Sequence, residues 1–204
     1  ATSADLELAR HLAPIIRFGD NEPFLPSRIG VTVFTEPSPS PSASHAITLG
    51  SGIAKVIEYA IWWDWDIQHL YELEHIWLHL DAENSVVAVE ASAHGGVYSM
   101  ALPDGTLPLE DGRVTLFSAP GKHAFTATAD AQRAVAADIT LACRDLAGSG
   151  AILINDMFGE ALHGFTAEDH RAVKRHLQSR AFLPSFQFHQ RVDLSTVDFT
   201  SWTE

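Results

Sequence analysis

Two carboxylates, Glu72 and Glu74, open a run of alternating residues that predicts a β-strand. Alternate side chains share one face of a strand, so both carboxylates lie on the face that continues with Ile76, Leu78 and Leu80. That face is otherwise apolar and is expected to form core. Burying an unpaired carboxylate is costly, so such a pair must be protonated, paired with cations or used to bind a metal ion.

Other potential ligands stand just ahead of this strand. His69 precedes the pair, and Asp64 and Asp66 end an aromatic-rich run. Carboxylate oxygens suit Mg²⁺ and Ca²⁺, and an added imidazole extends the choice to Mn²⁺ and Zn²⁺. The sequence therefore predicts a divalent metal site whose candidate ligands are Asp64, Asp66, His69, Glu72 and Glu74. The alternative is a set of ion-paired or hydrogen-bonded acids at a sheet edge, with only 13 Lys and Arg to balance 26 Asp and Glu.

Three further side chains offer acid or base chemistry beside such an ion. Glu90 and His94 share a strand face, and two glycines follow them, which favours a bulge or a close backbone approach. His123 follows a turn that leads into a strand, and its neighbour Lys122 could neutralise local carboxylates. Glu90, His94 and His123 are thus the candidate catalytic residues, with either histidine as base. Each also fits a structural role, because histidines beside turns are commonly only solvated.

The opposite face of the same predicted strand carries His75, Trp77 and His79. Histidines at this spacing can chelate Zn²⁺, but they also occur on half-exposed faces beside an aromatic residue, and we favour the second interpretation. The tryptophans Trp62, Trp63, Trp65 and Trp77 offer a stacking wall for a sugar ring, although core packing explains most buried tryptophans.

Composition limits the classes of partner. The chain has 204 residues and a formal charge of −13, without any cluster of Lys or Arg, and this disfavours nucleic acid as a partner. No apolar run approaches the roughly 20 residues of a membrane-spanning helix, so no transmembrane segment is expected. The single cysteine, Cys143, excludes an intrachain disulfide and is expected to be a buried thiol. The sequence leaves a soluble cytoplasmic protein and a secreted one equally open.

The first two thirds of the chain read as short β-strands separated by turn signals. Such spacing predicts an antiparallel sandwich or barrel. The expected strands span residues 14–18, 29–35, 45–49, 56–65, 71–80, 86–100 and 113–118. Residues 36–44, rich in Pro and Ser, are expected to form a mobile hairpin tip.

After residue 130 the pattern becomes helical. Val135, Ile139, Ala142 and Leu146 form one stripe, and Thr166 begins a second helix with a capping-box spacing. We therefore predict a mainly β protein of one domain, 1–204. It would consist of an antiparallel β-sandwich core over about 12–130, with peripheral α-helices in the C-terminal third, about 131–204.

Residues 55–127 resemble the necrosis- and ethylene-inducing-like protein (NLP) family. The resemblance rests on His69-x-x-Glu72-x-Glu74, on the strand that follows, and on Ser92-Ala93-His94-Gly95-Gly96. The family heptad Gly-His-Arg-His-Asp-Trp-Glu places its first histidine on His69, its aspartate on Glu72 and its last glutamate on Glu74. An upstream aspartate that also binds the ion falls on Asp66, or less well on Asp64.

The resemblance implies a β-sandwich with a Ca²⁺- or Mg²⁺-like ion in an acidic pocket, and a family of secreted cytolysins that recognise sphingolipid sugars. Four heptad positions depart from the family in addition to the Asp-to-Glu change: Gln68, Leu70, Tyr71 and Leu73. The family cysteines are also missing, and the helices after residue 130 have no counterpart. The resemblance therefore supports the fold and the cation site, and not toxicity.

Two functions remain open from the sequence. The first is a divalent-metal-dependent hydrolase of a phosphate-ester or carbohydrate substrate, which the surplus of titratable groups favours. The alternative is a cation-dependent module that binds a glycan, a lipid headgroup or another small molecule without catalysis. A deep cleft with a histidine beside an open cation position would favour catalysis, whereas a shallow acidic rim would favour recognition.

Overall fold

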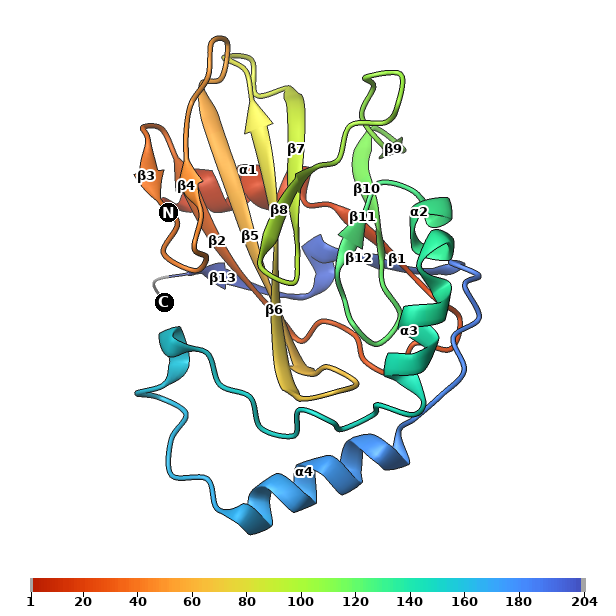
Figure 1. Ribbon diagram of the computed structural model, residues 1–204. Coiled ribbons are helices and arrows are strands. Elements are labelled where there is room, and N and C mark those ends of the chain that lie inside the picture. Colours follow the sequence, from red (N-terminus) through yellow and green to blue (C-terminus); the bar gives the residue numbers. More distant parts are fainter. Residues whose placement is uncertain (1, 203–204) are drawn as a thin grey trace.

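The computed structural model describes residues 2–202 and has two mixed β-sheets packed together, with helices at their margins (Figure 1). The larger sheet has the order β13-β2-β5-β6-β7-β8, and the smaller has the order β11-β10-β1-β12, with β9 beside β10. The predicted β-sandwich class is confirmed. Two of the pairings are parallel, β1 with β10 and β13 with β2, so the sandwich is not wholly antiparallel.

The strands of the larger sheet are β2 (Arg28–Phe34), β5 (Lys55–Trp65), β6 (Leu70–Leu80), β7 (Val86–Ala93), β8 (Gly96–Ser99) and β13 (Asp198–Ser201). Those of the smaller sheet are β1 (Ile15–Phe18), β9 (Leu109–Glu110), β10 (Arg113–Ser118), β11 (Phe125–Thr126) and β12 (Gln190–Asp193). A separate hairpin consists of β3 (Ser38–Pro39) and β4 (Ala46–Ile47). The helices are α1 (Ser3–Leu12), α2 (Ala129–Ala134), α3 (Ala136–Cys143) and α4 (Ala167–Ser179), with the short 3₁₀ helices η1 (Asp156–Phe158) and η2 (Leu194–Thr196).

The core forms on one face of β5 and β6. Side chains such as Ile61 and Trp63 on β5, and Ile76 and Leu78 on β6, are fully buried between the sheets. Full burial of such side chains contributes about 1.5–3 kcal/mol each before the entropy of ordering is counted. Because β6 alternates without interruption, the same face carries Glu74 toward the end of the sandwich. Core packing thus fixes where the acidic residues lie.

Residues 86–100, expected as one strand, form a hairpin instead. β7 and β8 are joined by a two-residue turn at His94 and Gly95, whose φ angles are +50° and +83°. Two left-handed residues in succession match the twist of antiparallel strands, so the turn folds tightly. His94 therefore stands at the tip of a turn, where it can face the start of β6.

The C-terminal third is helical only in part. Val135 ends α2, so the expected stripe is split between two helices: Ile139 and Ala142 are buried, but Val135 and Leu146 are exposed. The capping box at Thr166 is present and begins α4. Beyond α4 the chain returns to both sheets as β12 and β13, two strands that the expected helical region, about 131–204, did not include. Alternating strands this short, four residues each, carry little periodic signal.

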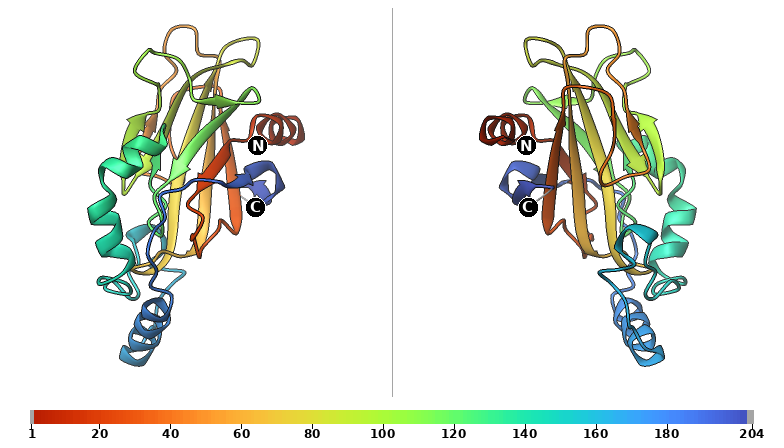
Figure 2. Two further views of the ribbon diagram at one scale, coloured as in Figure 1. Left: turned by 90° about the vertical axis from the view of Figure 1, so that its right-hand side faces the viewer. Right: turned by 90° about the vertical axis from the view of Figure 1, so that its left-hand side faces the viewer.

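The helices flank the sandwich on two sides (Figure 2). α2 packs on β10 and β11, whereas α1, which the sequence did not suggest, contacts β2 and β13 at the other side. Cys143 at the end of α3 is buried as expected, and its thiol donates to the Pro120 carbonyl at 3.1 Å. Burial raises the pKa of this thiol far above its usual range, which makes Cys143 a packing residue. Among residues 2–202 no helix is long and apolar enough to cross a bilayer.

The hairpin β3–β4 lies against the larger sheet rather than projecting as a mobile tip. Ser42, between its strands, is 2% exposed, and its hydroxyl donates to the buried carboxylate of Glu58 at 2.7 Å. Trp77 Nε1 donates to the other oxygen of Glu58, also at 2.7 Å. Glu58 therefore ties the hairpin to β5 and β6.

Candidate metal centre

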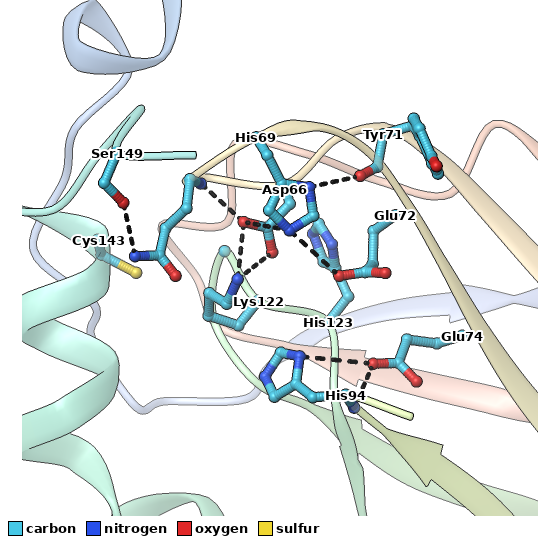
Figure 3. A network of polar contacts seen from close by, with 12 residues as sticks. Asp66, His69, Tyr71, Glu72, Glu74, His94, Lys122, His123, Cys143 and Ser149 are labelled. Carbon is cyan, nitrogen blue, oxygen red and sulfur yellow. Dashed lines mark hydrogen bonds and ion pairs between the residues drawn. The ribbon is translucent and has the colours of Figure 1, made fainter. Parts of the chain in front are cut away.

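The candidate site lies where the loop between β5 and β6 meets the turn after β10 (Figure 3). Asp66 is fully buried and its Oδ1 accepts the backbone N–H of Gln68 at 2.7 Å, which closes the loop. That loop also bridges to Ala151, because Leu70 N donates to its carbonyl at 2.8 Å. The loop between β5 and β6, the turn after β10 and the segment at Ala151 thus together hold Asp66 and His69 in place.

His69 presents an unprotonated nitrogen to two carboxylates. Its Nδ1 lies 2.9 Å from the carbonyl oxygen of Tyr71, and a carbonyl can only accept, so Nδ1 carries the proton of the neutral ring. Nε2 then holds a lone pair, and it lies 3.7 Å from Asp66 Oδ1 and 3.8 Å from Glu72 Oε2. Such an arrangement is unfavourable unless the ring gains a second proton or a cation sits between the three groups.

Glu72 is the residue that two groups of potential ligands share. One group is Asp66, His69 and Glu72, and the other is Glu72, Glu74 and His94. In each group the donor atoms lie within 4.8 Å of one another, a span that one ion bridges at typical bond lengths of about 2.0–2.6 Å. Burial, followed by the nearby charges of Glu74 and Asp66, raises the pKa of Glu72 to about 8.

Glu74 is held by the β7–β8 hairpin. The Ser92 hydroxyl donates to Glu74 Oε2, and the backbone N–H of His94 donates to Oε1 at 3.0 Å. His94 Nδ1 lies 3.9 Å from the same oxygen, and its side chain is 51% exposed. Burial raises the pKa of Glu74 despite these hydrogen bonds. The turn at His94 therefore brings the candidate catalytic histidine to the edge of the acidic cluster.

One cation of the chain already reaches the cluster. Lys122 Nζ lies 2.8 Å from both oxygens of Asp66, which is the role the sequence suggested for it. One ammonium cannot balance Asp66, Glu72 and Glu74 together, so the site has a deficit of positive charge. Its donors are mostly carboxylate oxygens with one or two imidazoles, and this set fits a hard divalent cation such as Mg²⁺, Ca²⁺ or Mn²⁺, or Zn²⁺ as a borderline ion.

Backbone strain gathers around the same residues. Tyr71, His94 and His123 are all non-glycine residues in the left-handed region, with φ of +47°, +50° and +64°. Such conformations cost free energy and persist where the surroundings fix them, often at functional sites. Tyr71 is held further by its stacking on Trp62, with ring centroids 4.7 Å apart. The strain at Tyr71 places the carbonyl that orients His69.

Two predicted site residues lie outside the cluster, and a third, His123, is buried beside it (Figure 3). Asp64 lies on the outer face of the larger sheet, where its Oδ1 accepts from Trp62 Nε1 at 3.0 Å. Asp66 is separated from it because β5 ends at Trp65, so Asp66 belongs to the loop and does not continue the alternation of the strand. Glu90 also faces outward and pairs with His79 at 2.9 Å. His123 is fully buried, stacks on Trp63 and has no hydrogen-bond partner for either ring nitrogen among the described residues. Buried in this way, His123 is not placed to act as a base on a bound ligand.

The acidic cluster opens into a cleft of about 400 Å³. Its lining includes Glu72, Glu74 and His94, together with residues of the β3–β4 hairpin and of η1. The sequence carries no direct signal for the hairpin and η1 parts of this lining, because the hairpin was expected at a mobile tip and η1 has no periodic pattern. Met157 and His45 are among the residues of those parts. A small ligand in the cleft would contact the acidic cluster together with residues of the hairpin and of η1.

Comparisons with known proteins add the following. No protein-family model and no curated protein sequence matches the chain. Among solved structures, a triple mutant of NLPPya is similar over 62% of this chain and 68% of that one, at 18% identity and a TM-score of 0.45. NLPPya in complex with glucosamine is similar over 60% and 66%, at 19% identity and a TM-score of 0.41.

A structure described as a toxin fold for microbial attack and plant defense is similar over 63% of this chain and 71% of that one, at 18% identity and a TM-score of 0.42. The matched part spans about two thirds of the length of each of these proteins. The matches agree with the predicted NLP-like fold. Nothing about ligand or activity follows from likenesses of this degree.

Proposed function

We propose that this protein is a cation-dependent binding module whose ligand is a glycan or a similar polyhydroxy molecule. The observation that carries the proposal is the lone pair of His69 Nε2, which faces Asp66 and Glu72 at 3.7 and 3.8 Å. Together with the raised pKa of Glu72, this geometry is that of a site preorganised for a cation. When bound, a divalent ion supplies positive charge and open coordination positions for ligand oxygens.

The surroundings favour neutral oxygens over anionic ones. Three carboxylates and one lysine approximately balance a divalent ion, so the loaded cleft gains no excess positive charge to attract a phosphate. Sugar hydroxyls can reach an ion without such an excess. His45 and His94 lie around the same cleft and offer hydrogen bonds to further hydroxyls.

Divalent cations are expected to stabilise the protein. Binding only to the native state adds RT ln(1 + [L]/Kd), about 2.7 kcal/mol at a hundredfold excess over Kd, or roughly 5–10 °C in Tm for a chain of this size. The measurement is a melting curve of chelator-treated protein titrated in turn with Mg²⁺, Ca²⁺, Mn²⁺ and Zn²⁺. An identical Tm across all four titrations, in protein shown by elemental analysis to start metal-free, would contradict the proposal. A cation-dependent response to sugars in calorimetry would then identify the ligand class.

A hydrolase of phosphate esters or carbohydrates is the second candidate, and His94 favours it. Its imidazole is half exposed and belongs to the same ligand group as Glu72 and Glu74, close enough to serve as base for a molecule bound there. Turnover that chelator abolishes, and that His94→Ala lowers by about 10²–10⁴-fold with cation binding retained, would assign the cleft to a hydrolase. Absence of turnover on both substrate classes, with cation binding present, leaves the binding module.

A further inference from the structure

A second cavity, of about 680 Å³, lies on the outer face of the larger sheet, away from the acidic cluster. It spans β13, β2 and β5, three neighbouring strands whose residues 198, 28 and 62 stand opposite one another. Its floor is made of small buried residues, Gly30 and Ala60, which are paired across the two strands. The outer face of a sheet is hollow here because two adjacent positions lack large side chains.

Two tryptophans border this floor. Trp202 packs directly over Gly30: a Cβ at that position would lie 2.5 Å from Trp202 Cε3, so only glycine lets the indole rest on β2. Trp62 lies across the floor on β5 and is fixed by its stacking on Tyr71. Both side chains are only partly buried, so each keeps accessible ring surface. The glycine and the stacked tyrosine are what position the two rings.

Polar side chains line the other end of the cavity. Asp64 Oδ1 accepts from Trp62 Nε1 at 3.0 Å and from Ser27 Oγ at 3.2 Å, which orients the carboxylate and leaves Oδ2 without a hydrogen bond among the described residues. Arg28 and Asp198 form an exposed pair at 3.1 Å. The cavity thus offers exposed donors and acceptors beside aromatic surface.

We infer that this cavity is a second, cation-independent carbohydrate site that binds a pyranose ring. A pyranose has an apolar face of C–H bonds and an edge of hydroxyls. The C–H face packs on the negative face of an aromatic ring, and the hydroxyls suit carboxylate and guanidinium partners. The cavity has both features, side by side, within the volume range of small-molecule sites. Asp64 therefore orients a sugar in this cavity rather than a metal ion.

The site takes no side chain from the proposed cation centre, although Trp62 stacks on Tyr71, whose carbonyl oxygen accepts from His69. Asp64, Trp62 and Trp202 belong to neither ligand group, and the residues that line the two cavities do not overlap. Chelator separates the two proposals: it removes the cation, and it leaves this cavity unchanged. Sugar binding in this cavity is therefore expected whether or not the acidic cluster binds a cation.

The test is a titration of ¹⁵N-labelled full chain in EDTA with methyl α-glucoside, methyl α-mannoside, cellobiose, chitobiose and lactose, observed at the indole N–H signals. The chain has five tryptophans, and Trp62→Phe and Trp202→Phe assign the two signals of interest. At least one sugar is expected to shift both signals in saturable fashion. The buried Trp63 and Trp77 are expected to stay unshifted as internal controls.

Three variants refine the result. Gly30→Ala, which displaces Trp202, and Asp64→Asn are each expected to weaken sugar binding about tenfold, with cation binding unchanged. The matched control is Trp65→Phe, a tryptophan on the same strand that packs on His176 outside the cavity. Circular dichroism confirms that each variant is folded.

Three outcomes overturn the inference. The first is that no sugar shifts the signals of Trp62 and Trp202 in EDTA, and the second is that sugars shift them only when a divalent cation is present. The third is that tetramethylammonium shifts them and sugars do not, which would assign the tryptophans and carboxylates to a cationic ligand.

Discussion

Glu72→Gln is expected to weaken divalent-cation binding by about 100-fold or more and, in chelator, to stabilise the protein. Glu72 is shared by both ligand groups, so its loss removes a carboxylate from each. Mutation of residues that merely support a metal ligand already costs roughly 10–100-fold in affinity. In the chelated protein the same carboxylate repels Glu74 and Asp66, so the neutral amide relieves the repulsion. The sign of the stability change should therefore reverse with cation.

The pH dependence follows from the raised pKa of Glu72. Its folded-state pKa of about 8 exceeds the usual 4.5, so the native state favours the protonated form. The contribution of protonated Glu72 to the free energy of unfolding is fully present below pH 4.5 and is lost as pH rises toward 8. A shift of this size corresponds to about 5 kcal/mol as an upper bound, because the side chain keeps some solvent contact.

The measurement is urea unfolding of chelated wild-type and Glu72→Gln proteins from pH 5 to pH 8. The wild type is expected to lose stability across this range, and the variant to lose much less. Saturating cation should remove the difference in slope, because the bound ion holds Glu72 ionised. Glu83→Gln, at an exposed loop position, is the matched control and should follow the wild type. Parallel pH profiles for wild type and Glu72→Gln in chelator would disprove the assignment of Glu72.

The sequence predicts the ligand strand well because a strand has a fixed period. Alternation alone places Glu72 and Glu74 on the face of Ile76, and the structure has Glu74 and Ile76 buried on that face. The same rule, applied to β5, would place Asp64 and Asp66 on one face, because they are two residues apart, but the strand ends between them. The end of β5 at Trp65 determines that Asp64 faces outward and that Asp66 enters the buried loop. Strand boundaries are the least reliable part of sequence prediction.

Contacts between distant segments are not readable from one sequence. Nothing in the Pro- and Ser-rich segment indicates that Ser42 meets Glu58 and His75, because the contact depends on how the hairpin folds over the sheet. The pairing of β12 with β1 and of β13 with β2 likewise joins the two ends of the chain. Such pairings depend on the global packing of the sheets and not on local periodicity.

Glu58→Ala is expected to lower the free energy of unfolding by about 3–5 kcal/mol, because it leaves two buried donors without their acceptor. Those donors are the Ser42 hydroxyl and Trp77 Nε1, each 2.7 Å from Glu58. Ser42 gives its proton to Glu58, so His75 Nε2, 3.0 Å away, donates to Ser42 in turn. Burial lowers the pKa of His75 to about 4, which keeps the ring neutral at pH 7.

The same change should reach the cation site. The backbone N–H of His75 donates to Ser92 Oγ at 2.6 Å, and Ser92 donates to Glu74, so His75 links the Glu58 network, through its ring and its backbone, to a candidate ligand. Loss of Glu58 frees the hairpin that forms one wall of the cleft. Cation affinity should therefore fall together with stability, and limited proteolysis should cut within residues 36–50 in Glu58→Ala but not in the wild type.

Glu58→Gln tests whether the hydrogen bonds of Glu58 or its negative charge stabilise the hairpin. Its amide can accept from Trp77 and donate to Ser42, so the variant is expected to lose less than about 1.5 kcal/mol and to keep the hairpin protected from protease. Urea unfolding and proteolysis of both variants, with and without cation, provide the comparison. Equal destabilisation by Ala and Gln would mean that the charge of Glu58 is essential. Equal protease resistance in all three proteins would mean that the apolar contacts of Phe34, Ile47 and Trp77 hold the hairpin by themselves.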